Sequence, residues 1–253
     1  MTRIICDTMI WYELSKNRLH VPNPEKYTLV CTYLSLMELA FTPNNFKNLE
    51  EVQNVIRKIL SVEPELIMQS PISYARGLID SDFKVEYKIE EDLVMGFLRV
   101  LLNHPKDGLI NNEFKNQLNS ITSIRTKNND DWANFQNELY KPSKEMRHIL
   151  KKYSTAESYQ KYFNSKFANQ YSLRRYSKDQ IDWDKFELYE KVSERYLRNM
   201  DISKLKADRN DENDLKNMIY VQPEDKYWTL EKRWLSMIKE IKLDEYLYTQ
   251  PNN

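Results

Sequence analysis

Acidic residues beside apolar segments are the part of this sequence best suited to chemistry. Asp7 interrupts the apolar run IICDTMIWYEL, and Glu38 is the single acidic residue in CTYLSLMELAFT. A charge carried among core residues needs a partner or a cation, because leaving it buried and unpaired costs on the order of several kcal/mol. The alternatives are a helix N-cap for Asp7 and an exposed helical position for Glu38.

The segment 207–234, ADRNDENDLKNMIYVQPEDKYWTLEKRW, holds the densest group of carboxylates. Asp211 and Asp214 are three residues apart, so we expect both on one face at the start of a helix. Asp225 precedes a predicted strand, and Glu231 follows it. Capping and solvation remain the alternative for the two helical aspartates, and an exposed salt bridge remains the alternative for Glu231.

These positions share one geometric property, since each lies just past a strand or at the start of a helix beside one. Ligands of open α/β sheets bind beyond the carboxyl ends of the strands. Carboxylates that converge there repel each other, so the pattern predicts a hard divalent cation. Oxygen ligands without nearby Cys or His favour Mg²⁺ or Mn²⁺ over Zn²⁺. The converging set is Asp7, Glu38, Asp211 or Asp214, and Glu231.

The elements that must position these residues lie at the two ends of the chain. Residues 2–6 and 27–32 are short β-branched runs typical of buried parallel strands. Residues 226–230 and 244–248 predict two further strands on either side of a helix. This alternation predicts an α/β fold whose small parallel sheet is built from both chain ends.

The middle of the chain has a different pattern, with apolar residues recurring every three or four positions. It predicts a large all-helical insertion over 46–199 between the two halves of an α/β core, residues 1–45 and 200–253. Polar stretches at 125–131 and 171–180 are expected to be loops. The helices are expected at 50–61, 90–103, 112–124, 131–153 and 185–200.

Composition excludes several classes of function. The chain has only three glycines, so phosphate-binding loops of the dinucleotide and P-loop types are absent, and it has no G-x-S-x-G nucleophile elbow. Lys plus Arg equals Asp plus Glu at 38 each, so net charge favours no class of partner. Cys6 and Cys31 are expected as buried thiols of a reduced protein. Without a signal peptide or a long apolar run, we expect a cytoplasmic protein with no membrane contact.

The segments IICDTMIWYEL, LSLMELA, NDENDLKNMIYV and DKYWTLEKRW together resemble the PIN-domain ribonucleases, including toxin-type members. In that family an Asp ends the first strand, a Glu follows the second strand, an Asp opens a later helix, and Thr-x-Asp ends the fourth strand. The first 45 and last 50 residues carry the resemblance. Matching positions, in order, are Asp7, Glu38, the Asp211/Asp214 pair and Glu231, the last with Glu where Asp is typical.

This resemblance implies metal-dependent hydrolysis of RNA phosphodiester bonds. Asp7 would be the central ligand of Mg²⁺ or Mn²⁺, Glu38 and Asp214 its flanking ligands, and Asp211 and Glu231 outer or additional ones. Thr8, Thr229 and Asp225 are expected to support the ligands through hydrogen bonds.

A segment rich in basic and aromatic residues, 151–180, is the predicted RNA-binding surface. The alternative is a helical pair with its aromatic rings in the core. Two rival functions stay open: a non-catalytic PIN-like interaction or RNA-binding module, and a structure-selective DNA nuclease. Also open are a protein inhibitor of the antitoxin type and a homodimer. The basic residues expected to bind substrate are Lys151, Lys152, Arg174 and Arg175.

Overall fold

The computed structural model describes residues 1–41, 48–80, 82–83, 88–104, 112–139, 181–203 and 205–250. At its centre lies a sheet of four parallel strands in the order β3-β2-β1-β4. The mixed α/β class expected from the sequence is therefore confirmed. The strands are β1 (Thr2–Cys6), β2 (Tyr27–Thr32), β3 (Glu65–Ile67) and β4 (Lys226–Trp228).

The central strands are buried on both faces, which explains their continuous apolar sequences. Ile5, Val30 and Tyr227 point into one hydrophobic cluster. Cys6 and Cys31, paired across β1 and β2, point into the other. Both cysteines are free and buried, as the sequence predicted.

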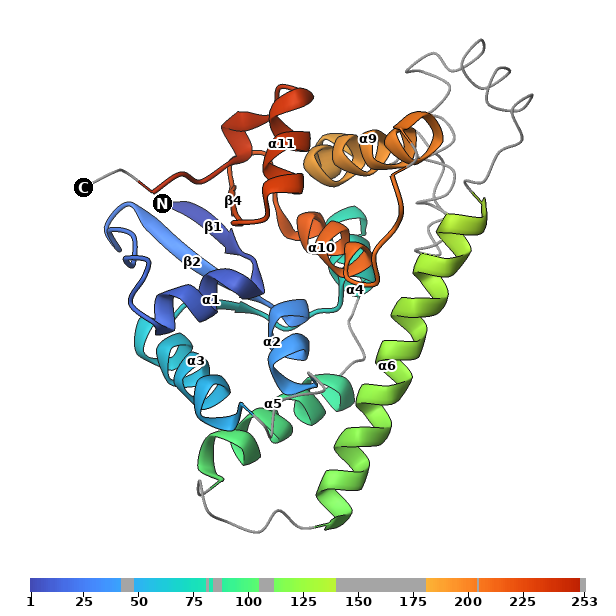
Figure 1. The fold of residues 1–253 in the computed structure, drawn as a ribbon. Coiled ribbons are helices and arrows are strands. Elements are labelled where there is room, and N and C mark those ends of the chain that lie inside the picture. The colour runs from blue at the N-terminus through green and yellow to red at the C-terminus, as the bar shows by residue number, and fades with distance from the viewer. Residues whose placement is uncertain are drawn as a thin grey trace.

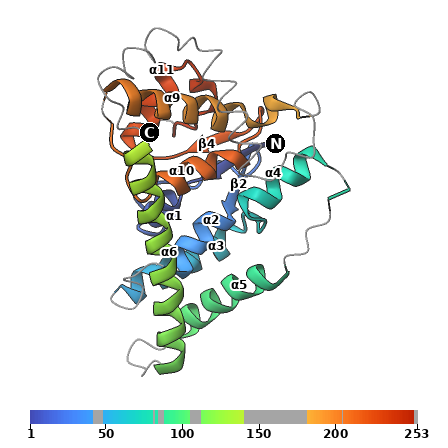
Figure 2. The same ribbon diagram turned by 90° about the vertical axis from the view of Figure 1, so that its right-hand side faces the viewer.

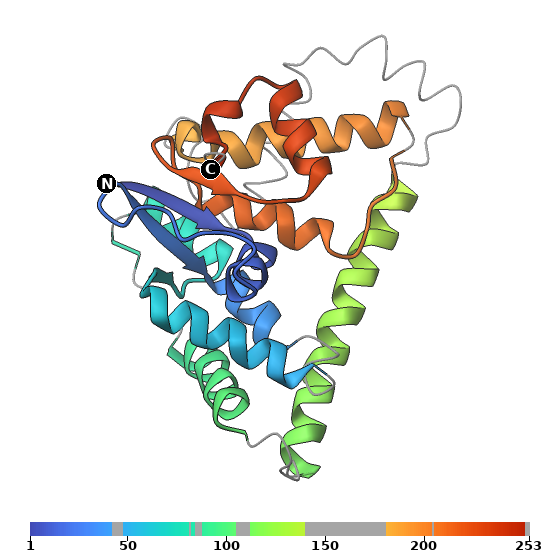
Figure 3. The same ribbon diagram turned by 60° about the vertical axis from the view of Figure 1, so that its left-hand side comes forward.

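Helices cover both faces of this sheet, so the molecule has three layers (Figures 1 and 3). One cluster lies between the sheet and α4 (Pro71–Ile79), α9 (Glu187–Ser203), α10 (Asp211–Asn217) and α11 (Lys232–Glu240). The other lies between the sheet and α1 (Thr8–Ser15), α2 (Tyr33–Ala40), α3 (Leu49–Val62) and α5 (Lys88–Asn103).

The long helix α6 (Asn112–Leu139) runs along one side of these layers (Figure 2). In its first half, Thr122 Oγ1 donates a hydrogen bond to the carbonyl of Phe41, 3.4 Å away. Further along, the Asn137 side chain exchanges two hydrogen bonds with the backbone of Ala207, at 2.8 and 3.1 Å. The helix therefore connects the segment after α2 with the segment before α10.

Three expectations about elements are wrong. The strand β3 lies within the segment expected to be all-helical, and its three residues are too few to show a strand pattern. Residues 125–131 are not a loop but part of α6, where tertiary contacts outweigh the polar composition. Residues 244–248 do not form a full strand: they begin with a 3₁₀ turn, Asp244–Tyr246, which buries Tyr246, and only Leu247 forms an isolated parallel bridge, to Tyr227 of β4.

The loop expected at 171–180 and the end of the helix expected at 131–153 lie outside the described residues. No helix in the described part of the chain is both long and apolar enough to cross a membrane.

Candidate active site

Asp7 lies where β1 passes into α1, at the carboxyl edge of the sheet. It occupies the N-cap position of α1, but its side chain makes no capping hydrogen bond. Instead its Oδ2 accepts a hydrogen bond from Thr229 Oγ1 at 2.9 Å, just past the end of β4. The residue is only 9% exposed. Asp7 is thus held toward the neighbouring strand end, so the capping interpretation does not account for it.

Glu38 reaches the same region from α2, which follows the adjacent strand β2. Its Oε1 lies 3.5 Å from Nη2 of Arg125, a residue of α6. The same guanidinium donates through Nη1 to the carbonyl of Met37 at 3.0 Å. Glu38 therefore has a cationic partner that comes from the distant helix α6.

Asp214 belongs to the short helix α10 and accepts a hydrogen bond from the Trp234 indole Nε1 at 3.0 Å. Burial raises the pKa of Asp214 well above its ordinary value, and the negative charges of Asp7 and Glu231 raise that pKa further. The Trp234 hydrogen bond acts in the opposite direction. Asp214 is thus close enough to Asp7 and Glu231 to feel their charges.

The same interactions act on Asp7. Burial raises the pKa of Asp7 to about 6, with repulsion from Glu38 as the next cause and a smaller contribution from Glu231. The Thr229 hydrogen bond opposes this shift. The carboxylates from β1, α2, α10 and the β4 end therefore converge, as the sequence predicted, and their mutual repulsion favours protonation or a compensating cation.

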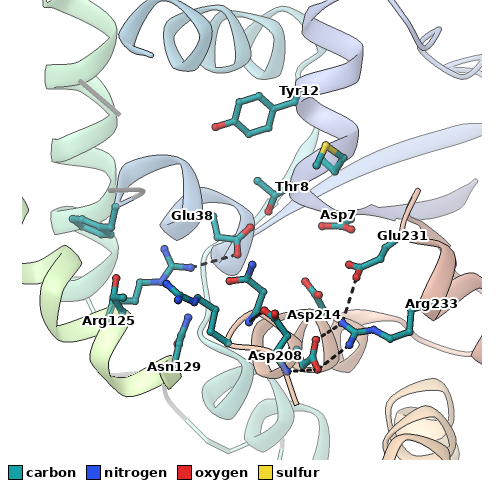
Figure 4. A pocket seen from close by; sticks show the side chains of 16 residues that line it. Asp7, Thr8, Tyr12, Glu38, Arg125, Asn129, Asp208, Asp214, Glu231 and Arg233 are labelled. Atoms are coloured by element: carbon teal, nitrogen blue, oxygen red, sulfur yellow. Dashed lines mark hydrogen bonds and ion pairs between the residues drawn. The ribbon is translucent and has the colours of Figure 1, made fainter. Parts of the chain in front are cut away.

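These side chains surround a cavity of about 750 Å³ (Figure 4). Thr8, another predicted site residue, also lines it, whereas Thr229 acts on it through Asp7. The acidic residues of the lining are Asp7, Glu38, Asp208, Asp211, Asp214 and Glu231.

Asp211 lines this cavity too, but its carboxylate is engaged in a structural network. Both of its oxygens are bound by the guanidinium of Arg233, which donates to Oδ2 at 3.0 Å and also contacts Oδ1. Oδ2 also accepts hydrogen bonds from the Tyr196 hydroxyl at 2.6 Å and the Asp208 N–H at 2.8 Å. Asp211 is fully buried. These contacts favour a role in joining α9, α10 and α11.

Glu231 lies at the rim of the cavity, with its side chain 42% exposed. Its Oε1 is 3.3 Å from Arg233 Nη2, so the salt bridge considered from the sequence is present. Its backbone N–H also donates to Thr229 Oγ1 at 3.1 Å.

Asp225 does not join the group. It precedes β4 and therefore lies at the amino edge of the parallel sheet, opposite the strand ends that carry Asp7 and Glu231. There its carboxylate accepts a hydrogen bond from the Gln222 N–H at 3.0 Å and pairs with Arg3 at 3.4 Å. The expectation that Asp225 supports the site is wrong, because Asp225 precedes β4 whereas Thr229 and Glu231 follow it, and the two ends of a strand lie at opposite edges of the sheet.

Sequence reasoning missed the residues that reach the cavity from other elements. Arg125, Thr126 and Asn129 come from α6, in the stretch expected to be a loop. Arg209 and Tyr12 also line the cavity. One sequence signal could have predicted the helix. Ile121 and Trp132, on either side of the polar stretch, are 11 residues apart, which is about three helical turns and places both on one helix face. The predicted substrate residues Lys151, Lys152, Arg174 and Arg175 lie outside the described residues.

The donor set available to a metal is made of carboxylate oxygens, the type that Mg²⁺ and Mn²⁺ prefer. Among the described residues, however, no three His, Cys, Asp or Glu side chains are grouped as a metal site requires. The carboxylates thus surround the cavity without forming a coordination shell in this structure.

Comparison with known proteins finds no matching family model, no similar curated protein and no similar solved structure.

Proposed function

We propose that this protein is a metal-dependent ribonuclease that hydrolyses phosphodiester bonds at the carboxyl edge of its sheet. The observation that carries the proposal is the convergence of Asp7, Glu38, Asp214 and Glu231 on one cavity, where burial and mutual repulsion raise the pKa of Asp7 and Asp214. Such a cluster is costly to the fold, and perturbed carboxylates in a cavity are a common property of functional sites.

The residues present fit a hard divalent cation in ligand type and in charge. Asp7 and Asp214 would be its central ligands, and Glu38 and Glu231, which line the same cavity, would complete the ligand set. When bound, Mg²⁺ or Mn²⁺ would polarise the phosphate and lower the pKa of an attacking water. Hydrogen bonds from Thr229 and Trp234 would orient the two central carboxylates.

RNA is proposed as the substrate because the order of the acidic positions resembles that of the PIN-domain ribonucleases. A non-catalytic binding module with the same sheet is the second candidate. Two observations favour this binding module. The ion pairs Glu38–Arg125 and Glu231–Arg233 already neutralise two of the carboxylates, and the described residues include no group of side chains arranged as metal ligands.

The decisive experiment measures cleavage of single-stranded RNA in Mn²⁺ by the wild type and by the Asp7→Asn variant. We expect at least about a hundredfold loss of rate, because ligation of the metal contributes several kcal/mol to the transition state. Asp244→Asn is the matched control, since Asp244 is exposed and does not line the cavity. It should cleave at the wild-type rate.

Thermal unfolding separates the two candidates. A cation that binds only the folded state should raise the melting temperature of the wild type, and this gain should disappear in Asp7→Asn. A protein that cuts neither RNA nor DNA and gains no stability from Mn²⁺ would contradict the proposal. Cleavage of DNA alone would identify a DNA nuclease, and RNA binding without cleavage would identify the module.

A further inference from the structure

One wall of the cavity is formed by α6 rather than by the sheet edge. Arg125, Thr126 and Asn129 line the cavity from this helix. Arg125 and Asn129 lie on one side of the site, whereas Asp7 and Glu231 lie on the other, with Glu38 between them (Figure 4). The cavity therefore has an acidic side at the strand ends and a side with cationic and neutral hydrogen-bond donors at α6.

Arg125 is held in position by its contacts with α2. Its Nη1 donates to the Met37 carbonyl and its Nη2 lies 3.5 Å from Glu38, while its side chain is 18% exposed. A guanidinium carries five N–H donors in a rigid plane that matches the geometry of phosphate oxygens. Because the Arg125 side chain is already held in place, it loses less conformational entropy when it binds an anion.

A second arginine reaches the cavity from the turn before α10. Arg209 Nε lies 3.3 Å from Asp130 of α6, and the Arg209 side chain is 57% exposed. The third cavity arginine, Arg233, binds both oxygens of Asp211 and is therefore committed to the fold. Arg125 and Arg209 are thus the lining cations best placed to meet an anion.

A nucleic-acid strand needs such cations here. Its phosphates are repelled by the carboxylates at the strand ends, and a cation held there would offset that repulsion only locally. A phosphate one step along the strand would meet the α6 wall instead.

We propose that Arg125 and Arg209, together with the neutral donors Thr126 and Asn129, form a subsite for a backbone phosphate adjacent to the bond that is cut. The proposal rests on the ribonuclease function proposed above. It assigns to α6 a direct part in substrate binding, beyond its packing against Phe41 and Ala207.

The test measures how binding of a short fluorescein-labelled oligouridylate depends on salt. Fluorescence anisotropy is recorded in the Asp7→Asn background with Mg²⁺ present, so that no strand is cut. Each phosphate contact on a single strand contributes about 0.7 to the slope of log Kd against log salt concentration. Arg125→Ala and Arg209→Ala should each lower this slope by about 0.7, and Arg125→Lys should leave it unchanged.

Arg18→Ala is the matched control, because Arg18 is exposed, pairs with Glu13 and does not line the cavity. Its slope should equal that of the parent. If Arg125 is only the structural partner of Glu38, Arg125→Ala will change thermal stability but leave the slope of the parent intact, and the proposal is overturned. Absence of oligouridylate binding by the parent overturns it as well.

Two further comparisons keep the result decisive. Should Arg125→Ala fail to fold, the exposed Arg209 provides the same readout. Wild-type cleavage of RNA in Mn²⁺ is measured in parallel. Cleavage with unchanged slopes rejects the subsite alone, whereas reduced slopes without cleavage support phosphate binding at α6 but reject the hydrolase and, with it, a subsite next to a cut bond.

Discussion

Asp211 and Asp214 lie three residues apart on α10, yet the structure gives their charges opposite surroundings. Asp211 is bound by Arg233, the Tyr196 hydroxyl and a backbone N–H. Asp214 accepts a hydrogen bond from the neutral indole of Trp234 and faces the negative charges of Asp7 and Glu231. One aspartate is therefore matched with a cation, whereas the other is placed among like charges.

The difference separates a stabilising carboxylate from a functional one. A buried ion pair with additional hydrogen bonds holds elements together, and removing one partner leaves the other charge uncompensated. A carboxylate that repels its neighbours contributes nothing of this kind, so its presence needs an explanation in binding or catalysis. We therefore expect opposite effects on stability from mutations in the Asp211 network and mutations of Asp7 or Asp214.

The largest expected effect is on stability at Asp211. Asp211→Ala should lower the free energy of unfolding by about 3 kcal/mol, because Arg233 and Tyr196 lose their shared partner. This is the lower end of the usual range, since the Arg233 side chain remains 26% exposed. Asp214→Asn should leave stability unchanged or increase it, because it relieves repulsion. Urea unfolding in the absence of metal measures both.

Asp208→Ala serves as the comparison for the first variant, because it removes a neighbouring carboxylate without removing the partner of Arg233. If Asp211→Ala and Asp214→Asn prove equally destabilising, the division between structural and functional aspartates is wrong.

The second effect is a pH dependence of stability at Asp7. Folding raises the pKa of Asp7 from its ordinary value of 3.8 to about 6, so the folded state favours the protonated form. The resulting stability is fully present below pH 4 and is lost as the pH rises through about 6. The loss is roughly 3 kcal/mol at most, from 1.36 kcal/mol per pH unit.

Metal-free unfolding of the wild type and Asp7→Asn between pH 4 and 8 isolates this contribution. The stability of the wild type relative to the variant should fall across that window. A difference that is constant with pH would show that burial and repulsion do not raise the pKa of Asp7 on folding.

The smallest effect concerns the hydrogen bond from the Thr229 hydroxyl that orients Asp7. Thr229→Val removes the donor to Asp7 Oδ2 and the acceptor of the Glu231 N–H, so it should cost about 1 kcal/mol of stability. It should also raise the pKa of Asp7 further, since this hydrogen bond favours the ionised form. NMR titration of the Asp7 carboxyl carbon measures the pKa shift.

Thr122→Val makes the same chemical change at a hydroxyl that contacts Phe41 instead. It should leave the titration of Asp7 unaltered. An unchanged pKa of Asp7 in Thr229→Val would mean that the Thr229 hydrogen bond does not favour the ionised form of this carboxyl group.

Much of the fold was predictable because its signals are local. The β-branched runs of β1 and β2 identified two buried parallel strands, and the acidic residue after each identified the edge where a site would lie. The short strand β3 and the 3₁₀ turn at Asp244–Tyr246 were not predictable from pattern, because three residues show no period. Their conformations depend on the strands and helices against which they pack.

The sequence by itself determined which carboxylates could meet, since Asp7, Glu38 and Glu231 each follow an element of one parallel sheet. Only the tertiary structure decided that Asp214 rather than Asp211 faces Asp7, because that choice depends on where Arg233 and Tyr196 lie. It also decided that Arg125 reaches Glu38 across 87 positions of the chain, from residue 38 to residue 125. Contacts between residues so far apart leave no local pattern, since they are made by the packing of whole helices and not by neighbouring side chains.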